Sequence, residues 1–289
     1  MEKMTDWITL WRELVEAQSK GWHKKADSDD HWHEKARGFD RLVKERWAAG
    51  PDSSREFVVA QLEAHPGSTV LDIGAGTGAW TVLMAHHARR VTVVEPSEAM
   101  IEVLKENLAA EGVANVEIVQ GAWPEAEVEP HDFALCSHAM YGCPDFPAFV
   151  GQMVEATRRT CFLVLRAPIK GSVMVEAAMR VWGQPHDSPN FQVAYNALLQ
   201  MGLFPNVLIE DTGLWDPWTH DSFEEALTET KRRLGLAEKS EHDEFLAELL
   251  GKRLVCENGQ WVWPRSVRSA LVYWETGDWV VSLPELRGK

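Results

Sequence analysis

Residues 70–78 read VLDIGAGTG, and this stretch decides the fold of the chain. Val70, Leu71 and Ile73 are the apolar residues of a buried strand, and three glycines at alternate positions follow them. Glycine lets the backbone turn sharply and approach a ligand without a Cβ in the way. The spacing G-x-G-x-G differs from the G-x-G-x-x-G of loops that bind pyrophosphate. The stretch therefore predicts a strand, loop and helix that bind a nucleotide-like cofactor with no phosphates to hold.

A second buried strand is predicted at residues 90–94 (RVTVV), and it ends in Glu95. In a doubly wound sheet, an acid at the tip of the next strand, roughly 20 residues beyond the glycine loop, is placed to accept both hydroxyls of a ribose. Glu95 stands at this distance from Gly78. The two strands therefore predict a ribose site next to the loop.

With this order of strand, loop, helix, strand and acid, and with EPSEAM at residues 95–100, the chain resembles the class I S-adenosylmethionine-dependent methyltransferases. The resemblance covers residues 68–210. It implies an α/β fold with a seven-stranded, doubly wound, mostly parallel sheet, and S-adenosyl-L-methionine as cofactor. The residues that it places around the cofactor are Asp72, Gly74, Ala75, Gly76, Gly78, Glu95, Pro96, Met100, Gly121, Ala122, Trp123 and Ser137.

The adenine contact departs from the family pattern. Many members have an acid and a small residue after the third strand, whereas this chain has Gln120 followed by Gly121. The backbone of Ala122 and Trp123, with the Trp123 indole, is the expected replacement. Met100 has two interpretations, a core residue or a contact to the adenine ring.

Further strands are expected at residues 116–119, 133–137, 161–165 and 206–210, with an antiparallel seventh at 269–274. Helices are expected near 7–18, 53–64, 98–111, 191–201, 222–234 and 241–250, and Asn258-Gly259 predicts a hairpin turn. The predicted organisation is a helical lid (1–52), a cofactor-binding core (53–211), a cap insertion (212–268), and a last core strand with a tail (269–289). The resemblance implies that the lid folds over the cofactor through Trp32, Ala36, Phe39 and Asp40.

Residues after the fourth strand are the catalytic candidates, because the acceptor arrives at the carboxyl edge of the sheet. Methyl transfer is an in-line displacement, and an O–H or protonated N–H acceptor also has to lose a proton. His138 is the predicted base, since histidine ordinarily titrates near neutral pH, and Tyr141 is the second candidate. Alternatively, His138 or Ser137 only hydrogen-bonds the methionine carboxylate or the loop backbone. Trp32, His186 and Tyr195 are the predicted substrate-binding residues.

The formal net charge of −15 argues against nucleic acid and anionic membranes as partners. The densest basic run, residues 231–233, is interpreted as one solvated turn of helix. The chain contains no run of 18 apolar residues, and its amphipathic start lacks the features of a secretory signal, so we expect a cytoplasmic protein. The sequence leaves open whether the chain forms a homo-oligomer.

Metal and disulfide frameworks are not predicted. The four cysteines, Cys136, Cys143, Cys161 and Cys256, form no C-x-x-C pair. A segment with His23, His31, His33 and nearby aspartates suggests a metal, but histidines two positions apart point to different faces of a helix. We interpret this segment as a polar lid.

Three functions fit these observations. The first is methyl transfer to a small-molecule acceptor, favoured by the cofactor pattern, the acidic composition and the cap. The second is a protein methyltransferase, which requires an open acidic groove for a basic peptide. The third is a cofactor-binding protein without transfer activity, which the unusual Gln120 segment keeps open.

Overall fold

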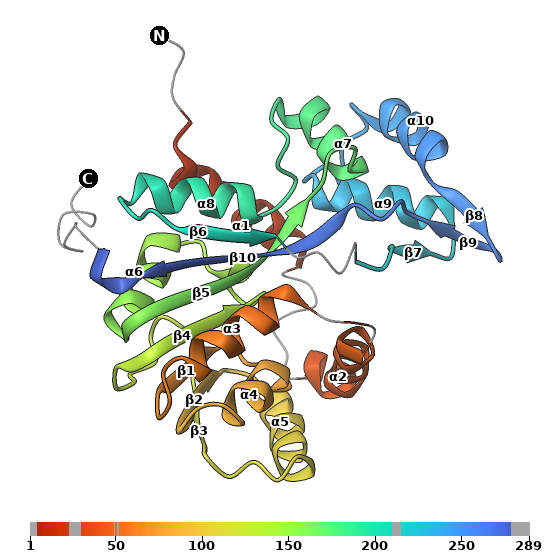
Figure 1. Ribbon diagram of the computed structural model, residues 1–289. Coiled ribbons are helices and arrows are strands. Elements are labelled where there is room, and N and C mark those ends of the chain that lie inside the picture. Colours follow the sequence, from red (N-terminus) through yellow and green to blue (C-terminus); the bar gives the residue numbers. More distant parts are fainter. Residues whose placement is uncertain (1–4, 23–29, 49, 51, 210–214, 279–289) are drawn as a thin grey trace.

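The computed structural model describes residues 5–22, 30–48, 50, 52–209 and 215–278 (Figure 1). Its centre is a seven-stranded sheet, and β10 is antiparallel to both of its neighbours. This confirms the predicted sheet and its antiparallel strand. The strands are, in spatial order, β3 (Val116–Gln120), β2 (Arg90–Glu95), β1 (Thr69–Ile73), β4 (His131–Ser137), β5 (Thr157–Pro168), β10 (Val267–Glu275) and β6 (Asn206–Ile209).

Each face of the sheet carries its own hydrophobic cluster, because successive side chains of a strand point to opposite faces. On β1, Leu71 and Ile73 belong to one cluster and Val70 to the other. The first face is covered by α1 (Trp7–Trp22), α6 (Phe146–Glu155) and α8 (Phe191–Gln200). The second is covered by α3 (Ser53–Glu63), α4 (Ala79–Ala85) and α5 (Glu98–Ala110).

Helix α1 is part of the core. Trp11 is fully buried, with its ring centroid 4.4 Å from that of Phe146. Its indole N–H donates to the Cys143 carbonyl at 2.9 Å. Burial of a tryptophan with its N–H satisfied stabilises such a contact by several kcal/mol, at about 25 cal/mol per Å². The apolar face of this amphipathic helix therefore packs on the core of the same chain.

A cap with its own hydrophobic cluster stands beyond the carboxyl ends of β5 and β6 (Figure 1). It contains α7 (Val173–Trp182), α9 (Phe223–Arg233) and α10 (Asp243–Arg253), with a small sheet of β7 (Thr219–His220), β9 (Gln260–Val262) and β8 (Val255–Glu257). Asn258 and Gly259 have φ of 50° and 82°, as the predicted hairpin turn requires. Helix α7 precedes residue 212 but packs in the cap cluster.

The remaining described elements are α2 (Asp30–Ala48), which packs on α5 (Figure 1), and two short 3₁₀ helices, Met140–Gly142 and Thr276–Asp278. Within the described residues, no helix is both long and apolar enough to cross a membrane. All four cysteines are free. The structure places no group of three or more His, Cys, Asp or Glu side chains to hold a metal within its described part.

Candidate active site

The glycine loop between β1 and α4 is built for close approach. Gly74, Gly76 and Gly78 all have left-handed φ, of 67°, 57° and 86°. A Cβ on Gly74 would lie 2.3 Å from the Cβ of Ala139, and one on Gly78 would lie 2.0 Å from Leu104 Cδ1. The loop therefore packs directly against the end of β4 and against α5.

Glu95 ties this loop to the next strand. Its Oε2 accepts from the Gly76 N–H at 2.9 Å, and its Oε1 accepts from the Ser97 N–H at 3.0 Å. Burial raises the pKa of Glu95, while the two backbone N–H groups act to lower it. Each carboxylate oxygen keeps a second lone pair, so the side chain is able to accept two further hydrogen bonds.

Asp72 faces the interior instead. It is 1% exposed, and its Oδ2 accepts from the Thr81 hydroxyl at 2.6 Å. Burial raises its pKa to about 7, and the charge of Glu95 acts in the same direction. Its described contact joins β1 to α4, so Asp72 shapes the loop from beneath.

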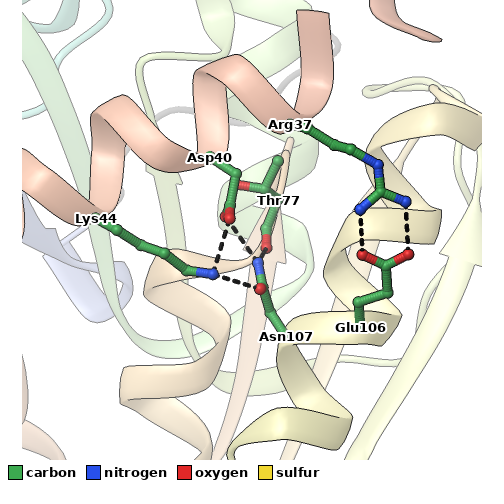
Figure 2. Close-up of polar contacts among 6 residues, drawn as sticks. All are labelled: Arg37, Asp40, Lys44, Thr77, Glu106 and Asn107. Carbon is green, nitrogen blue, oxygen red and sulfur yellow. Dashed lines mark hydrogen bonds and ion pairs between the residues drawn. The ribbon is translucent and has the colours of Figure 1, made fainter. Parts of the chain in front are cut away.

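Helix α2 lies over the loop and is fastened to α5 through Asn107 (Figure 2). The Asn107 amide donates to Asp40 Oδ1 and to the Thr77 carbonyl, both at 2.8 Å. Lys44 Nζ donates to Asn107 Oδ1 at 2.7 Å and lies 2.8 Å from Asp40 Oδ2. One side chain of α5 thus joins the helix to the glycine loop.

A second, exposed contact lies one turn away. Arg37 meets Glu106 in a bidentate ion pair with distances of 2.6 and 2.7 Å (Figure 2). On the inner side, Phe39 Cε1 lies 3.8 Å from the point that a Cβ on Gly76 would occupy. Ala36 is buried beside Met100. These contacts place the predicted lid residues of α2 over the loop, while the side chain of Trp32 lies outside the described part.

The expected adenine residues are distributed around the same edge. Met100 is 4% exposed and belongs to the small cluster of Ala36, Ala99 and Val103. The Gly121 N–H donates to the Glu95 carbonyl at 3.2 Å. The Trp123 indole N–H donates to the Phe149 carbonyl at 3.1 Å, so this ring is held on α6. Of the others, Ala75 and Ser137 are half-buried, and Pro96 and Ala122 are exposed.

His138 and Tyr141 meet just beyond β4. The Tyr141 oxygen lies 3.0 Å from His138 Nδ1 and accepts from the Arg166 backbone N–H at 2.6 Å. Because that oxygen already accepts one hydrogen bond, we assign its own hydrogen to Nδ1, which leaves the neutral imidazole protonated at Nε2. The Arg166 guanidinium lies 4.1 Å from the centroid of the Tyr141 ring. The two predicted catalytic residues are therefore joined to the end of β5.

Burial lowers the pKa of His138 to about 3, and the positive charges of Arg166 and Arg46 act in the same direction. This differs from the near-neutral titration expected from the sequence, because the ring is enclosed among cations. The Trp215 ring packs edge-on against it, with centroids 5.0 Å apart, and Arg46 lies over Trp215. His138 also has a left-handed φ of 57°. It is held as a neutral group.

Beyond Trp215, at the carboxyl end of β5, lies a cavity of about 170 Å³. It extends from the start of β10 to the cap. Its lining includes Arg166, Asp187, Trp215, Trp218, Arg233 and Trp263.

Of the predicted substrate residues that the structure describes, His186 and Tyr195 do not line this cavity. His186 precedes Asp187 and packs edge-on against Trp7, with ring centroids 5.9 Å apart. Tyr195 packs against Phe191 and the core cluster. Arg166 could not be recognised from the sequence, because an arginine at the end of an apolar strand carries no spacing signal.

The interpretation of residues 231–233 as a solvated turn is wrong. Lys231 pairs with Asp243 at 2.6 Å, and the Arg233 guanidinium lies 4.1 Å from the Trp218 ring centroid. The Arg233 side chain is only 19% exposed. The last turn of α9 packs against other elements of the cap, where Lys231 pairs with Asp243 and both arginines pair with Glu229. Basic residues buried by packing cannot be told from exposed ones by composition.

The strand order, with one antiparallel strand at the sixth position of the sheet, and the glycine loop facing an acid at the tip of β2 define a class I methyltransferase fold. Residues 70–160 match the family described as "Methyltransferase domain". The chain therefore contains a class I methyltransferase domain of the kind that depends on S-adenosylmethionine.

Relatives agree on the domain and differ in their acceptors. The chain is 27% identical over 133 residues to a malonyl-[acyl-carrier protein] O-methyltransferase of Serratia marcescens, covering 45% of this chain and 51% of that protein. It is 34% identical over 104 residues to a protein-L-isoaspartate O-methyltransferase of Methylorubrum populi, covering 34% and 48%. The chain spans about half the length of these curated relatives. The YcgJ protein of Bacillus subtilis shares the fold, with a TM-score of 0.50, 16% identity and coverage of 76% and 96%.

The residues present fit S-adenosylmethionine. Gly76 has no Cβ, and among the described residues only Phe39 lies within 4 Å of the point that a Cβ would occupy. Glu95 has spare acceptor capacity for the two hydroxyls of a ribose. The loop and Glu95 are the groups that would hold the cofactor, with α2 above them.

Proposed function

We propose that this chain transfers a methyl group from S-adenosylmethionine to a small-molecule acceptor held in the cavity beside Trp215. The observation that carries the proposal is the cavity itself. It is about 170 Å³ in volume, and Trp215 in its lining packs on His138. The residue after His138, Ala139, lies against Gly74 of the glycine loop. A site of this size suits a small molecule better than a folded protein surface.

S-adenosylmethionine, when bound, supplies a methyl group on a positively charged sulfur. In the proposed reaction Glu95 binds the ribose, and the glycine loop and α2 hold the cofactor in place. Orientation is the main contribution expected from the protein, because the displacement requires nucleophile, methyl and sulfur in line.

The proposed role of His138 is positioning. A group with a pKa of about 3 is a weak base at neutral pH, so it contributes little to removing a proton. Its Nε2–H, fixed by the Tyr141 hydrogen bond, is able to donate to an acceptor oxygen or nitrogen. Tyr141 in turn holds His138 against the end of β5 through the Arg166 backbone.

A protein methyltransferase is the second candidate. The acidic net charge and the relative that acts on isoaspartyl protein favour it. It requires an open acidic groove, whereas the cavity beside Trp215 is lined by Arg166, Arg233 and three tryptophans. A cofactor-binding protein without transfer activity would show cofactor affinity alone.

The test is to incubate the full chain with S-adenosylmethionine carrying a radioactive methyl group and with a cell extract separated by size. Label in the small-molecule fraction, lost with Glu95→Gln, is the expected result. Label in proteins alone would favour the second candidate. Label in neither fraction, with S-adenosylhomocysteine still bound, would favour a protein without transfer activity.

A further inference from the structure

We propose that the cavity beside Trp215 binds the acceptor through a carboxylate, which is held between Arg166 and Arg233. This inference deepens the proposed function and rests on it for the identity of the ligand as an acceptor. The two arginines come from different elements, Arg166 from the end of β5 and Arg233 from the last turn of α9, and both line the cavity. An anionic group between them would join the cap to the sheet.

Arg166 has a donor to spare. Its Nη2 donates to the Pro189 carbonyl at 3.2 Å, and its plane rests on the Tyr141 ring. Its Nε is fully buried and has no hydrogen-bond partner in the described structure. A buried N–H of a charged group without a partner is costly, and a ligand carboxylate would satisfy it.

Arg233 is fixed in place in a similar way. Its Nε donates to Glu229 at 2.8 Å, and the face of its guanidinium lies on Trp218. Glu229 also receives two hydrogen bonds from Arg232, so it is shared between two arginines. Among the described residues, no hydrogen-bond acceptor is found for the two terminal nitrogens of Arg233, which lines the cavity.

The charges of the cavity favour one negative group. Asp187 is 6% exposed, lines the same cavity and stands near Arg233, as Arg166 does. Arg265, also in the lining, is paired with Asp216 at 2.9 Å on the outer side. With that pair set aside, the described lining residues include two arginines, Arg166 and Arg233, against one acid, Asp187. This balance suits a monocarboxylate and opposes a cation.

The other walls are flat and apolar. Trp215, Trp218 and Trp263 line the cavity together with Met174 and Val267. Trp215 also touches His138, so a ligand against its ring would extend toward the catalytic residues. The expected ligand class is therefore a small carboxylate with a flat apolar body.

The test measures binding of carboxylates and their neutral counterparts to the full chain with S-adenosylhomocysteine present. The probes are benzoate and indole-3-acetate, each paired with its amide, followed through the tryptophan indole N–H signals by NMR, with Trp215 assigned from Trp215→Phe. We expect each carboxylate to bind about tenfold or more tightly than its amide. Arg166→Met and Arg233→Met should each weaken carboxylate binding about tenfold and leave the affinity for S-adenosylhomocysteine unchanged.

Two variants make the test sharper. Arg265 lines the same cavity, but its charge is paired with Asp216. Arg265→Met should therefore change carboxylate binding less than about twofold. Asp187→Asn removes the competing anion and should tighten carboxylate binding, an effect that a merely structural arginine site would not show.

The inference is overturned if amides bind as tightly as carboxylates, if neither binds, or if benzylamine binds and Asp187→Asn abolishes it. Each result is separate from the methyl-transfer assay. Carboxylate binding without labelled product would keep this site and reject the proposed function. Labelled product without a preference for carboxylates would reject this site and keep the proposed function.

Discussion

The cofactor side and the acceptor side of this site are assembled in different ways. On the cofactor side, the loop amide of Gly76 binds Glu95, which is 19 residues away, and both belong to one strand, helix and strand unit. On the acceptor side, the cavity joins Arg166 of β5, Arg233 of α9 and Trp263, which follows β9. A site built within one unit leaves its spacing in the sequence, whereas a site built between distant segments leaves none.

The largest expected effect is that of Gly74→Ala, on the cofactor side. The substitution adds a left-handed strain of about 1 to 2 kcal/mol and places a methyl group against Ala139, which has no flexible end to move away. We expect binding of S-adenosylhomocysteine, measured by isothermal titration, to weaken about 100-fold or more. The melting temperature should also fall.

Gly112→Ala is the matched control. Gly112 has nearly the same φ, 66° against 67°, but no atom of the residues that the structure describes lies within 4 Å of the added Cβ. This variant should lose about 1 kcal/mol of stability from the strain alone and bind S-adenosylhomocysteine as the wild type does. Equal losses of binding in both variants would contradict the close packing of the loop against β4.

The next effect is that of Glu95→Gln. Both carboxylate oxygens of Glu95 accept a hydrogen bond from a backbone N–H. In Glu95→Gln the side-chain NH₂ replaces one of these oxygens and faces a backbone N–H, and the negative charge is lost. Binding of S-adenosylhomocysteine should weaken by about 2 to 3 kcal/mol. Glu98→Gln, in the exposed first turn of α5, is the control with the same chemical change. An unchanged dissociation constant for Glu95→Gln would reject the ribose site.

The cofactor side and the acceptor side also show what the sequence could and could not predict. The seven strands along the chain, the antiparallel orientation of β10 and the Asn258-Gly259 turn are all found as expected. The cavity does not follow, because the burial of Arg233 depends on Trp218 and on the fold of the cap. Asp72 illustrates the same limit, since its partner Thr81 is set by how α4 packs on β1.

A smaller effect is expected at His138, between the two sides. Its pKa is lowered to about 3 in the folded state, so below about pH 6.5 the unfolded chain binds the proton and the folded one does not. Stability therefore falls as pH falls. His138→Asn keeps a residue that tolerates the left-handed φ of 57° and removes this titration.

Urea unfolding at pH 7 and at pH 5 measures this contribution. The wild type should lose about 1 to 2 kcal/mol more than His138→Asn over this interval. His131 is buried and its pKa is also lowered by burial, but it is present in both proteins and cancels in the comparison. The same loss in both proteins would show that His138 is already solvated and titrates normally.

The smallest effects are expected in the two contacts that hold α2 over the loop. Asn107→Ala removes hydrogen bonds to Asp40, to Lys44 and to the Thr77 carbonyl, which joins the helix to the glycine loop (Figure 2). We expect hydrogen exchange of the α2 amides to accelerate and binding of S-adenosylhomocysteine to weaken by about 1 kcal/mol, the typical net value of a protein hydrogen bond.

Arg37→Ala breaks a bidentate ion pair with distances as short as 2.6 Å, yet it should change both measurements less than Asn107→Ala does. The Arg37 and Glu106 side chains are 68% and 53% exposed, so water and salt screen the pair, and it contributes little to stability. Adding salt should remove what effect remains. If Arg37→Ala released α2 as strongly as Asn107→Ala, the helix would be held from its exposed side, and the link from α5 to the loop would not control access to the cofactor.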